Sequence, residues 1–120
     1  MFNEATIQWY GMANFQIFKS DKSTAYYYLL RATGNQEIIL ESEGYATKYA
    51  ALQGIDTAKG NARFDQSYEL KEGIYYTFLL KAGNGETVGR SKKYLSVTDR
   101  DNAMVLVKQE APNAIIEDLT

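Results

Sequence analysis

The sequence contains no cysteine and no histidine among its 120 residues. The absence of cysteine excludes disulfides, thiolate metal sites and cysteine nucleophiles. The absence of histidine removes the commonest metal ligand and the usual general base near neutral pH. We therefore predict that the protein is not an enzyme and that it holds neither a cofactor nor a metal ion.

Long hydrophobic runs and an excess of one charge are also missing. No apolar segment approaches the ~20 residues that a membrane-spanning helix needs, and the first residues lack the basic-then-apolar pattern of a signal peptide. Thirteen Lys and Arg residues against fifteen Asp and Glu residues give a net charge of −2. We therefore expect no strong attraction to polyanions. These absences predict a cytoplasmic protein that does not bind membranes, and the length predicts one domain spanning residues 1–120.

The most informative pattern is an internal duplication. The segment 29–32, Leu-Leu-Arg-Ala, recurs at 79–82 as Leu-Leu-Lys-Ala, and Phe15 and Phe64 stand at the start of the two copies. After a slip of one residue, a constant offset continues the match in the pairs Asn35/Asn84, Glu37/Glu86, Ile39/Val88, Ser42/Ser91, Tyr45/Tyr94 and Thr47/Ser96. We predict four parts: a head at 1–14, repeat one at about 15–62, repeat two at about 64–111 and a C-terminal strand at 114–119.

Each repeat has the pattern of three strands followed by a helix. Alternate residues of a strand point to opposite faces, so one face is predicted to line the core with its aromatic residues, Tyr26, Tyr28, Tyr76 and Phe78. The sequence therefore predicts the α+β class. The expected architecture is two tandem β-β-β-α repeats packed as a pseudo-twofold dimer, with an antiparallel sheet and two helices.

Turn and capping residues predict where these elements begin and end. The pair Asn84-Gly85 predicts a hairpin with a type I′ turn, in which both central residues take positive φ. The glycines around it do not form a phosphate-binding loop, because a strand rather than a helix follows them. The helices are predicted to begin after Thr47 and Ser96, whose hydroxyls can accept a backbone N–H of the first turn. Gly54 predicts close packing of the first helix on the sheet, because glycine within a helix costs up to ~1 kcal/mol relative to alanine.

The sequence resembles the YegP-like family of small, uncharacterised bacterial domains. The resemblance covers about residues 15–120 and rests on the aromatic strand 76–82, the Asn-Gly-Glu turn 84–86, the pair Ser91 and Tyr94, and the Ala-Pro-Asn-Ala exit 111–114. It implies the fold and the duplication. It implies no catalytic residues, because the family has none established.

The strand face opposite the predicted core is the candidate partner-binding surface, with Tyr27, Leu29 and Leu79. The family pattern usually has Arg or Lys on this face, so the face is more apolar here than a solvated sheet requires. Exposed apolar patches often mark interfaces, so we expect an unknown protein partner or a second copy to bind there, with the chain a monomer or a homodimer. Alternatively, the face is buried between the repeats or under the head, where Trp9 and Tyr10 could cover it.

A small basic cluster supports weak nucleic-acid binding as the alternative function: Arg90, Lys92, Lys93 and Tyr94. Single-strand binders combine positive grooves with stacking rings. The first repeat has Glu41 and Glu43 at the positions of Arg90 and Lys92. A further hypothesis is therefore that the two strands face each other, or a partner, with complementary charges.

Overall fold

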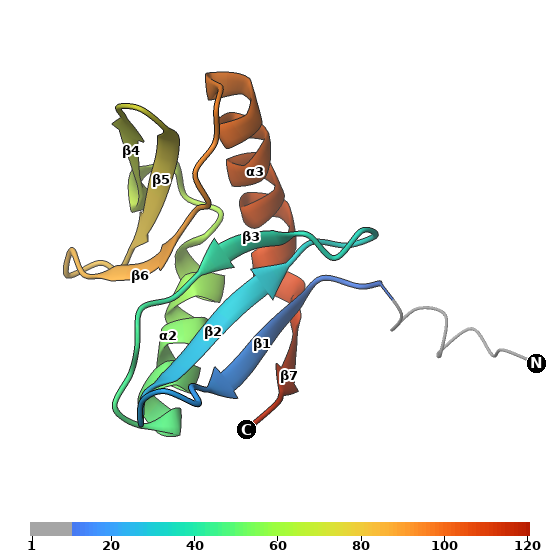
Figure 1. The fold of residues 1–120 in the computed structure, drawn as a ribbon. Helices are drawn as coiled ribbons and strands as arrows, with labels where there is room; N and C mark the ends of the chain where they lie inside the picture. The colour runs from blue at the N-terminus through green and yellow to red at the C-terminus, as the bar shows by residue number, and fades with distance from the viewer. Residues whose placement is uncertain (1–10) are drawn as a thin grey trace, which may run out of the picture.

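Within residues 11–120, seven strands form one continuous mixed sheet, and two helices cover one of its faces (Figure 1). The computed structural model describes residues 11–120. Across the sheet the strand order is β4-β5-β6-β3-β2-β1-β7. In chain order the elements are β1 (Asn14–Lys19), β2 (Tyr26–Arg31), β3 (Ile38–Glu41), α2 (Lys48–Asn61), β4 (Tyr68–Glu72), β5 (Tyr76–Lys81), β6 (Thr87–Arg90), α3 (Val97–Glu110) and β7 (Ile115–Asp118). The predicted α+β class is confirmed.

Antiparallel pairing joins six of the seven strands. β1, β2 and β3 pair in order, and so do β4, β5 and β6. The two three-stranded halves join where Glu41 of β3 pairs with Arg90 of β6. β7 runs parallel to β1, with Ile115 opposite Asn14. The prediction of an antiparallel sheet is therefore wrong for this last strand, because the chain leaves α3 through a short 3₁₀ helix and enters the sheet in the direction of β1.

Both helices begin at the predicted capping residues. The Thr47 hydroxyl accepts a hydrogen bond from the Ala50 N–H at 3.0 Å, and the Ser96 hydroxyl accepts one from the Asp99 N–H at 3.1 Å. The predicted close approach at Gly54 is also confirmed. A Cβ added there would lie 3.1 Å from Cε2 of Tyr28, which is buried under the helix.

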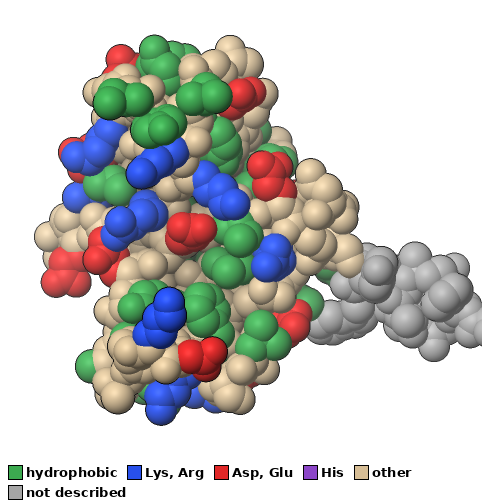
Figure 2. Space-filling view, viewed as in Figure 1, with side chains coloured by type: hydrophobic (Ala, Val, Ile, Leu, Met, Phe, Trp, Pro, Cys, Tyr) green, Lys and Arg blue, Asp and Glu red, His purple; other side chains and the backbone are tan. Residues whose placement is uncertain are grey.

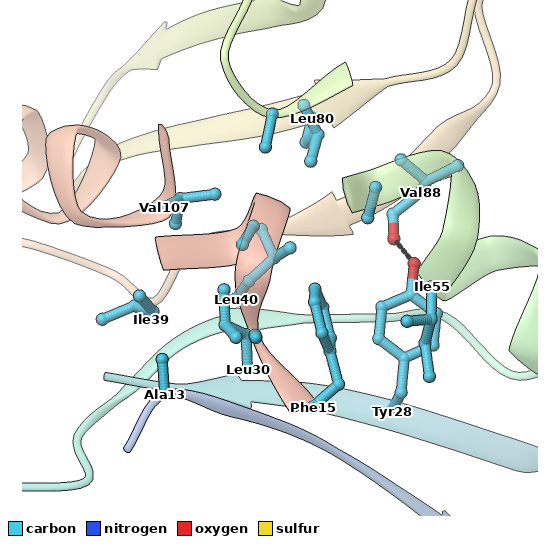
Figure 3. Packing of buried hydrophobic residues seen from close by; sticks show 14 of the residues in the cluster. Ala13, Phe15, Tyr28, Leu30, Ile39, Leu40, Ile55, Leu80, Val88 and Val107 are labelled. Carbon is cyan, nitrogen blue, oxygen red and sulfur yellow. Dashed lines mark hydrogen bonds between the residues drawn. The ribbon is translucent and has the colours of Figure 1, made fainter. Parts of the chain in front are cut away.

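The hydrophobic core lies between the sheet and the helices and continues from one half of the sheet to the other (Figure 3). Its largest fully buried side chains include Phe15, Tyr28, Leu30, Ile55, Phe78, Leu80 and Val107. Of the four aromatic residues predicted to line it, Tyr28 and Phe78 are fully buried, whereas Tyr26 and Tyr76 are half-buried.

Each helix ties the two halves of the sheet together. α2 packs on β1 and β2 and also on β5 and β6, whereas α3 packs on β3 and β5. Beneath α2, the Tyr28 hydroxyl of β2 donates a hydrogen bond to the Val88 carbonyl of β6 (Figure 3). Burial of this hydroxyl raises the pKa of Tyr28 far above its ordinary value. The halves therefore share one core as well as one sheet.

One predicted correspondence between the copies is wrong. Phe15 pairs with Leu30, and it is Tyr68 rather than Phe64 that pairs with the matching residue Leu80. Phe64 precedes a short 3₁₀ helix, Asp65–Ser67, and is 40% exposed. The β4–β5 turn, residues 73–75, is three residues shorter than the β1–β2 connection, residues 20–25. The offset that aligns the later strands therefore does not apply to the first one.

The hairpin after β5 is present, but its turn is not of type I′. The Gly85 N–H donates to the Ala82 carbonyl at 2.9 Å, and Gly85 has a positive φ of 87° while Asn84 does not. Asn84 instead accepts the Glu86 N–H with its side-chain oxygen at 3.0 Å. In the hairpin after β2, Gln36 has a positive φ of 59° at the position that corresponds to Gly85.

Candidate interaction surface

The sheet face turned away from both helices, called the outer face below, carries the predicted partner-binding residues. Tyr28, Leu30, Phe78 and Leu80 point into the core, so the residues between them in β2 and β5 point outward. Leu29 and Leu79 are therefore on the outer face, and both are half-buried. Each stands beside the junction of the two halves, since Leu29 pairs with Glu41 and Leu79 pairs with Arg90.

Tyr27 lies on the same face but does not contact the two leucines through the sheet register. It pairs with Phe18 of β1, and the two rings stack with centroids 5.8 Å apart and planes 18° apart. The hydrophobic side chains of the outer face form separate groups with charged side chains between them, as Figure 2 shows. The structure therefore brings Tyr27 together with Phe18 and places Leu29 and Leu79 on either side of a charged centre.

The charged centre joins the two halves of the sheet. Glu41 and Arg90 are paired residues of β3 and β6, and Arg90 forms an ion pair with Glu43. The hypothesis that the acidic residues of the first copy face the basic residues of the second is confirmed for these three side chains. Opposite charges on neighbouring strands favour this register.

The basic cluster of the alternative function is divided between different environments. Arg90 is on the outer face and bound to Glu43, whereas the Lys93 ammonium lies 5.5 Å from the centroid of the Tyr75 ring. Tyr94 packs against the core, and its hydroxyl is buried. Burial and, to a smaller extent, the nearby carboxylates raise the pKa of Tyr94. The Tyr94 ring therefore lies on the helix side of the sheet, apart from Arg90 on the outer face.

Two grooves open on the helix side at corresponding positions of the two halves of the sheet. One has a volume of about 320 Å³ between α2 and β6, and its lining includes Tyr45, Gly54 and Glu86. The other has a volume of about 330 Å³ between α3 and β3 and is lined by the corresponding Tyr94, Ala103 and Glu37, among others. Neither lining contains a cysteine or a histidine, and within residues 11–120 no three acidic side chains are grouped as a metal site would require.

Sequence reasoning missed an exposed apolar end of the second half. The antiparallel bridge between Tyr76 and Tyr94 brings the β4–β5 turn beside the loop that leads to α3. Ile74 of the turn is 88% exposed and Leu95 of the loop is 80% exposed. Figure 2 shows hydrophobic side chains gathered at this upper end. A position-by-position comparison of the two similar segments could have found the feature, because the first segment has small or polar residues there: Thr24 for Ile74, Ala25 for Tyr75, Ala46 for Leu95 and Lys48 for Val97.

Comparison with known proteins shows which family shares this architecture. The family model described as Domain of unknown function (DUF1508) matches two segments, residues 21–69 and 75–118. The chain belongs to this family. The first segment begins just before β2 and ends in β4, and the second runs from the end of the β4–β5 turn to β7.

Bacterial relatives extend the similarity over nearly the whole chain. A UPF0339 protein of Bordetella pertussis is 40% identical over 91% of this chain and 98% of its own length. The UPF0339 protein YegP of Yersinia pestis is 36% identical over 92% and 98%. The solution NMR structure of a UPF0339 protein of Shewanella oneidensis has a TM-score of 0.84 at 32% identity and covers 90% of this chain and 92% of that one.

A second solved relative is YegP of E. coli, described as a protein of unknown function. Its structure has a TM-score of 0.83 at 30% identity, with 91% and 94% coverage. The resemblance to the YegP-like family is thus confirmed, and what the family does is not established. Within residues 11–120, no helix is long and apolar enough to cross a bilayer.

Proposed function

We propose that this chain is a non-catalytic binding module that engages another protein molecule through the outer face of its sheet. The proposal rests on the arrangement of the helices, because both pack on the inner face of the sheet and neither covers the outer face. An antiparallel sheet that turns one face to water usually has polar residues there. Here the outer face has Leu29, Leu79 and the stacked pair of Phe18 and Tyr27, all half-buried. Apolar surface of this kind is typical of interaction sites.

The scaffold is proposed to be two fused repeats, at about 15–62 and 64–111, related by a pseudo-twofold axis at the junction of β3 and β6. Matching hydrogen bonds support this. The Ser42 hydroxyl accepts the Tyr28 N–H at 2.8 Å, and the Ser91 hydroxyl accepts the Phe78 N–H at 3.0 Å. Both β2 and β5 also shift register before their last residue. The two segments that match the family model support the same division.

One contact at the junction supports two different repeats fused in one chain rather than a symmetric pair of identical repeats. Leu40 and Gly89 hold corresponding positions, and a Cβ added to Gly89 would lie 2.7–2.8 Å from three carbons of the Leu40 side chain. Two leucines could not occupy both positions at this separation, since carbon atoms in contact are ~3.5–4.0 Å apart. A single chain can place a large residue in one repeat and glycine in the other, whereas a homodimer of single repeats cannot.

Protein binding is favoured over the two other functions considered. Nucleic-acid binding would need a continuous basic surface with accessible rings, and Arg90 and Tyr94 lie in separate environments with other partners. An enzyme of this composition would need a carboxylate or tyrosine in place of histidine as its base. A cytoplasmic location stays a prediction.

The first test asks whether the outer leucines are free of a structural role. The double variant Leu29→Lys/Leu79→Lys should keep its fold, with a free energy of unfolding within about 1 kcal/mol of wild type, because surface changes are usually small. The matched control Leu30→Lys/Leu80→Lys changes the adjacent, fully buried leucines and should not fold, since an unpaired buried charge costs several kcal/mol. If the outer variant unfolds like the control, the outer face is a structural surface and the proposal is wrong.

The second test detects the partner directly. A photo-reactive amino acid at position 29 should give a discrete cross-linked protein adduct in living cells. The same amino acid at position 49 serves as the control, because Tyr49 is exposed on α2 on the other side of the sheet. Equal adducts at both positions, or none at position 29, would contradict the proposal. For the alternative function, Lys92→Glu/Lys93→Glu should abolish salt-dependent binding of a single-stranded oligonucleotide, and we expect no such binding in wild type.

A further inference from the structure

The residues at the centre of the outer face form a row across the strands. This row is complementary to the same row of a second copy read in the opposite direction. Crossing four neighbouring strands, the register places Leu79, Arg90, Glu41 and Leu29 side by side. From this row, and resting on the function proposed above, we infer that the partner is a second copy of this chain. The two copies would pack outer face to outer face, about a twofold axis that lies between the two sheets, parallel to the strands and directly over the junction of β3 and β6.

The spacing of the row makes it self-complementary. Neighbouring strands lie ~4.8 Å apart, so Leu29 and Leu79 are about equally far from the middle of the Glu41–Arg90 pair, on opposite sides. A twofold axis parallel to the strands reverses the row in the second copy. Glu41 then faces Arg90 of the other copy, and Leu29 faces Leu79. An interface of this isologous kind uses the same patch on both subunits, as most soluble dimers do.

The central charges also select this arrangement over the unreversed one. Two copies stacked without reversal would place Glu41 against Glu41 and Arg90 against Arg90, and like charges across an interface disfavour association strongly. Arg90 has the capacity for a second acceptor, because its guanidinium carries five N–H donors and its ion pair with Glu43 uses Nη2. The Arg90 side chain is half-exposed, so this capacity is accessible on the outer face.

Other occupants of the same face predict a different behaviour. A second copy supplies the complementary row of leucine, acid, base and leucine by symmetry, whereas a different protein would have to provide a complementary surface of its own. Cover by the head of the same chain, residues 1–10, would leave the molecule a monomer at every concentration. An experiment that measures self-association therefore distinguishes a second copy from these other occupants.

The test uses charge reversal at the two central positions. Glu41→Lys alone should set two positive charges against each other across the interface, and Arg90→Glu alone should set two negative charges against each other. Each variant should therefore raise the dimer dissociation constant at least ~10-fold over wild type. In an equimolar mixture, the heterodimer has one cross-contact between the two substituted positions and one between the two native residues, and both unite opposite charges. Association should then return to within a few-fold of wild type. Native mass spectrometry with one variant isotope-labelled identifies the heterodimer, and circular dichroism checks that each variant is folded.

Three results would overturn the inference in different ways. If wild type stays a monomer at all accessible concentrations, the partner is not a second copy, although the outer face can still bind another protein. If wild type dimerises but the mixture of variants does not recover, the twofold arrangement is wrong. If Leu29→Lys/Leu79→Lys fails to fold, the proposed function itself fails. As a matched control, Asp56→Lys in α2 should leave self-association unchanged, because Asp56 is exposed on the helix side of the sheet, away from the outer face.

Discussion

Replacing Gly89 by alanine should destabilise the protein, although glycine within a strand is ordinarily the weaker residue. The added Cβ would lie 2.7–2.8 Å from Cγ, Cδ1 and Cδ2 of Leu40. Leu40 is fully buried between the two halves of the sheet, so its side chain cannot move into solvent. Overpacking of a buried site costs ~1–3 kcal/mol, and we expect a loss in that range for Gly89→Ala.

Urea unfolding followed by circular dichroism measures this loss, and a double-mutant cycle assigns it to Leu40. Leu40→Ala alone should cost ~2–5 kcal/mol, as truncation of a buried leucine does. In the Leu40→Ala background the cost of Gly89→Ala should disappear, which gives a coupling energy of at least ~1 kcal/mol. Gly83→Ala is the matched control, because nothing lies within 4 Å of a Cβ at Gly83. It should change the free energy of unfolding by less than ~0.5 kcal/mol.

The reasoning is refuted if Gly89→Ala is neutral or stabilising. It is equally refuted if Gly89→Ala lowers the free energy of unfolding by the same amount with leucine as with alanine at position 40. The loss would then not arise from the contact with Leu40. Either result would remove the size complementarity on which the proposed fusion of two repeats depends.

The remaining predictions concern α2 and its contact with β7. Gly54→Ala should destabilise the protein, because the added Cβ would lie 2.8 Å from Cζ of Tyr45, which stacks on Tyr28. In the same helix Gly60→Ala should stabilise the protein by up to ~1 kcal/mol, since nothing lies within 4 Å of a Cβ added at Gly60. If thermal unfolding shows that both substitutions raise, or both lower, the melting temperature, the packing described for α2 is contradicted. Lys48, which is hydrogen-bonded to Asp118, together with Thr120 lowers the pKa of Asp118 to about 2 from 3.8. Because the folded pKa is the lower one, this contribution to stability is complete above about pH 4 and is lost as the pH falls through about 2. Lys48→Met should return the pKa towards 3.8 in an NMR titration of the carboxyl group; an unchanged value would contradict the contact.

Features set by residues close together in the sequence were predictable. Thr47 and Ser96 cap the helices as expected, because an N-cap needs only a hydroxyl and the N–H three residues later. The two faces of β2 and β5 follow from strict alternation of side chains. Gly54 was informative because glycine within a helix usually has a packing reason.

Features set by pairing between distant strands were not predictable to the same degree. The direction of β7 depends on where α3 ends relative to β1, and no local pattern encodes that. The separation of Arg90 from Tyr94 is a tertiary effect, since residues four apart in the sequence here belong to a strand and to the loop after it. For the same reason, the sequence predicted Leu29 and Leu79 on one face and suggested a charge pairing of Glu41 with Arg90, but it did not place that pair between the two leucines.

The most direct test of the account is the molar mass of the wild-type protein and of Leu29→Lys/Leu79→Lys, measured by size exclusion with light scattering over a wide concentration range. The account predicts that wild type rises with concentration from the mass of one chain towards that of two, while the folded variant keeps the mass of one chain. A wild type that keeps the mass of one chain throughout, or a variant that dimerises as readily as wild type, would contradict the claim that the outer face binds a second copy.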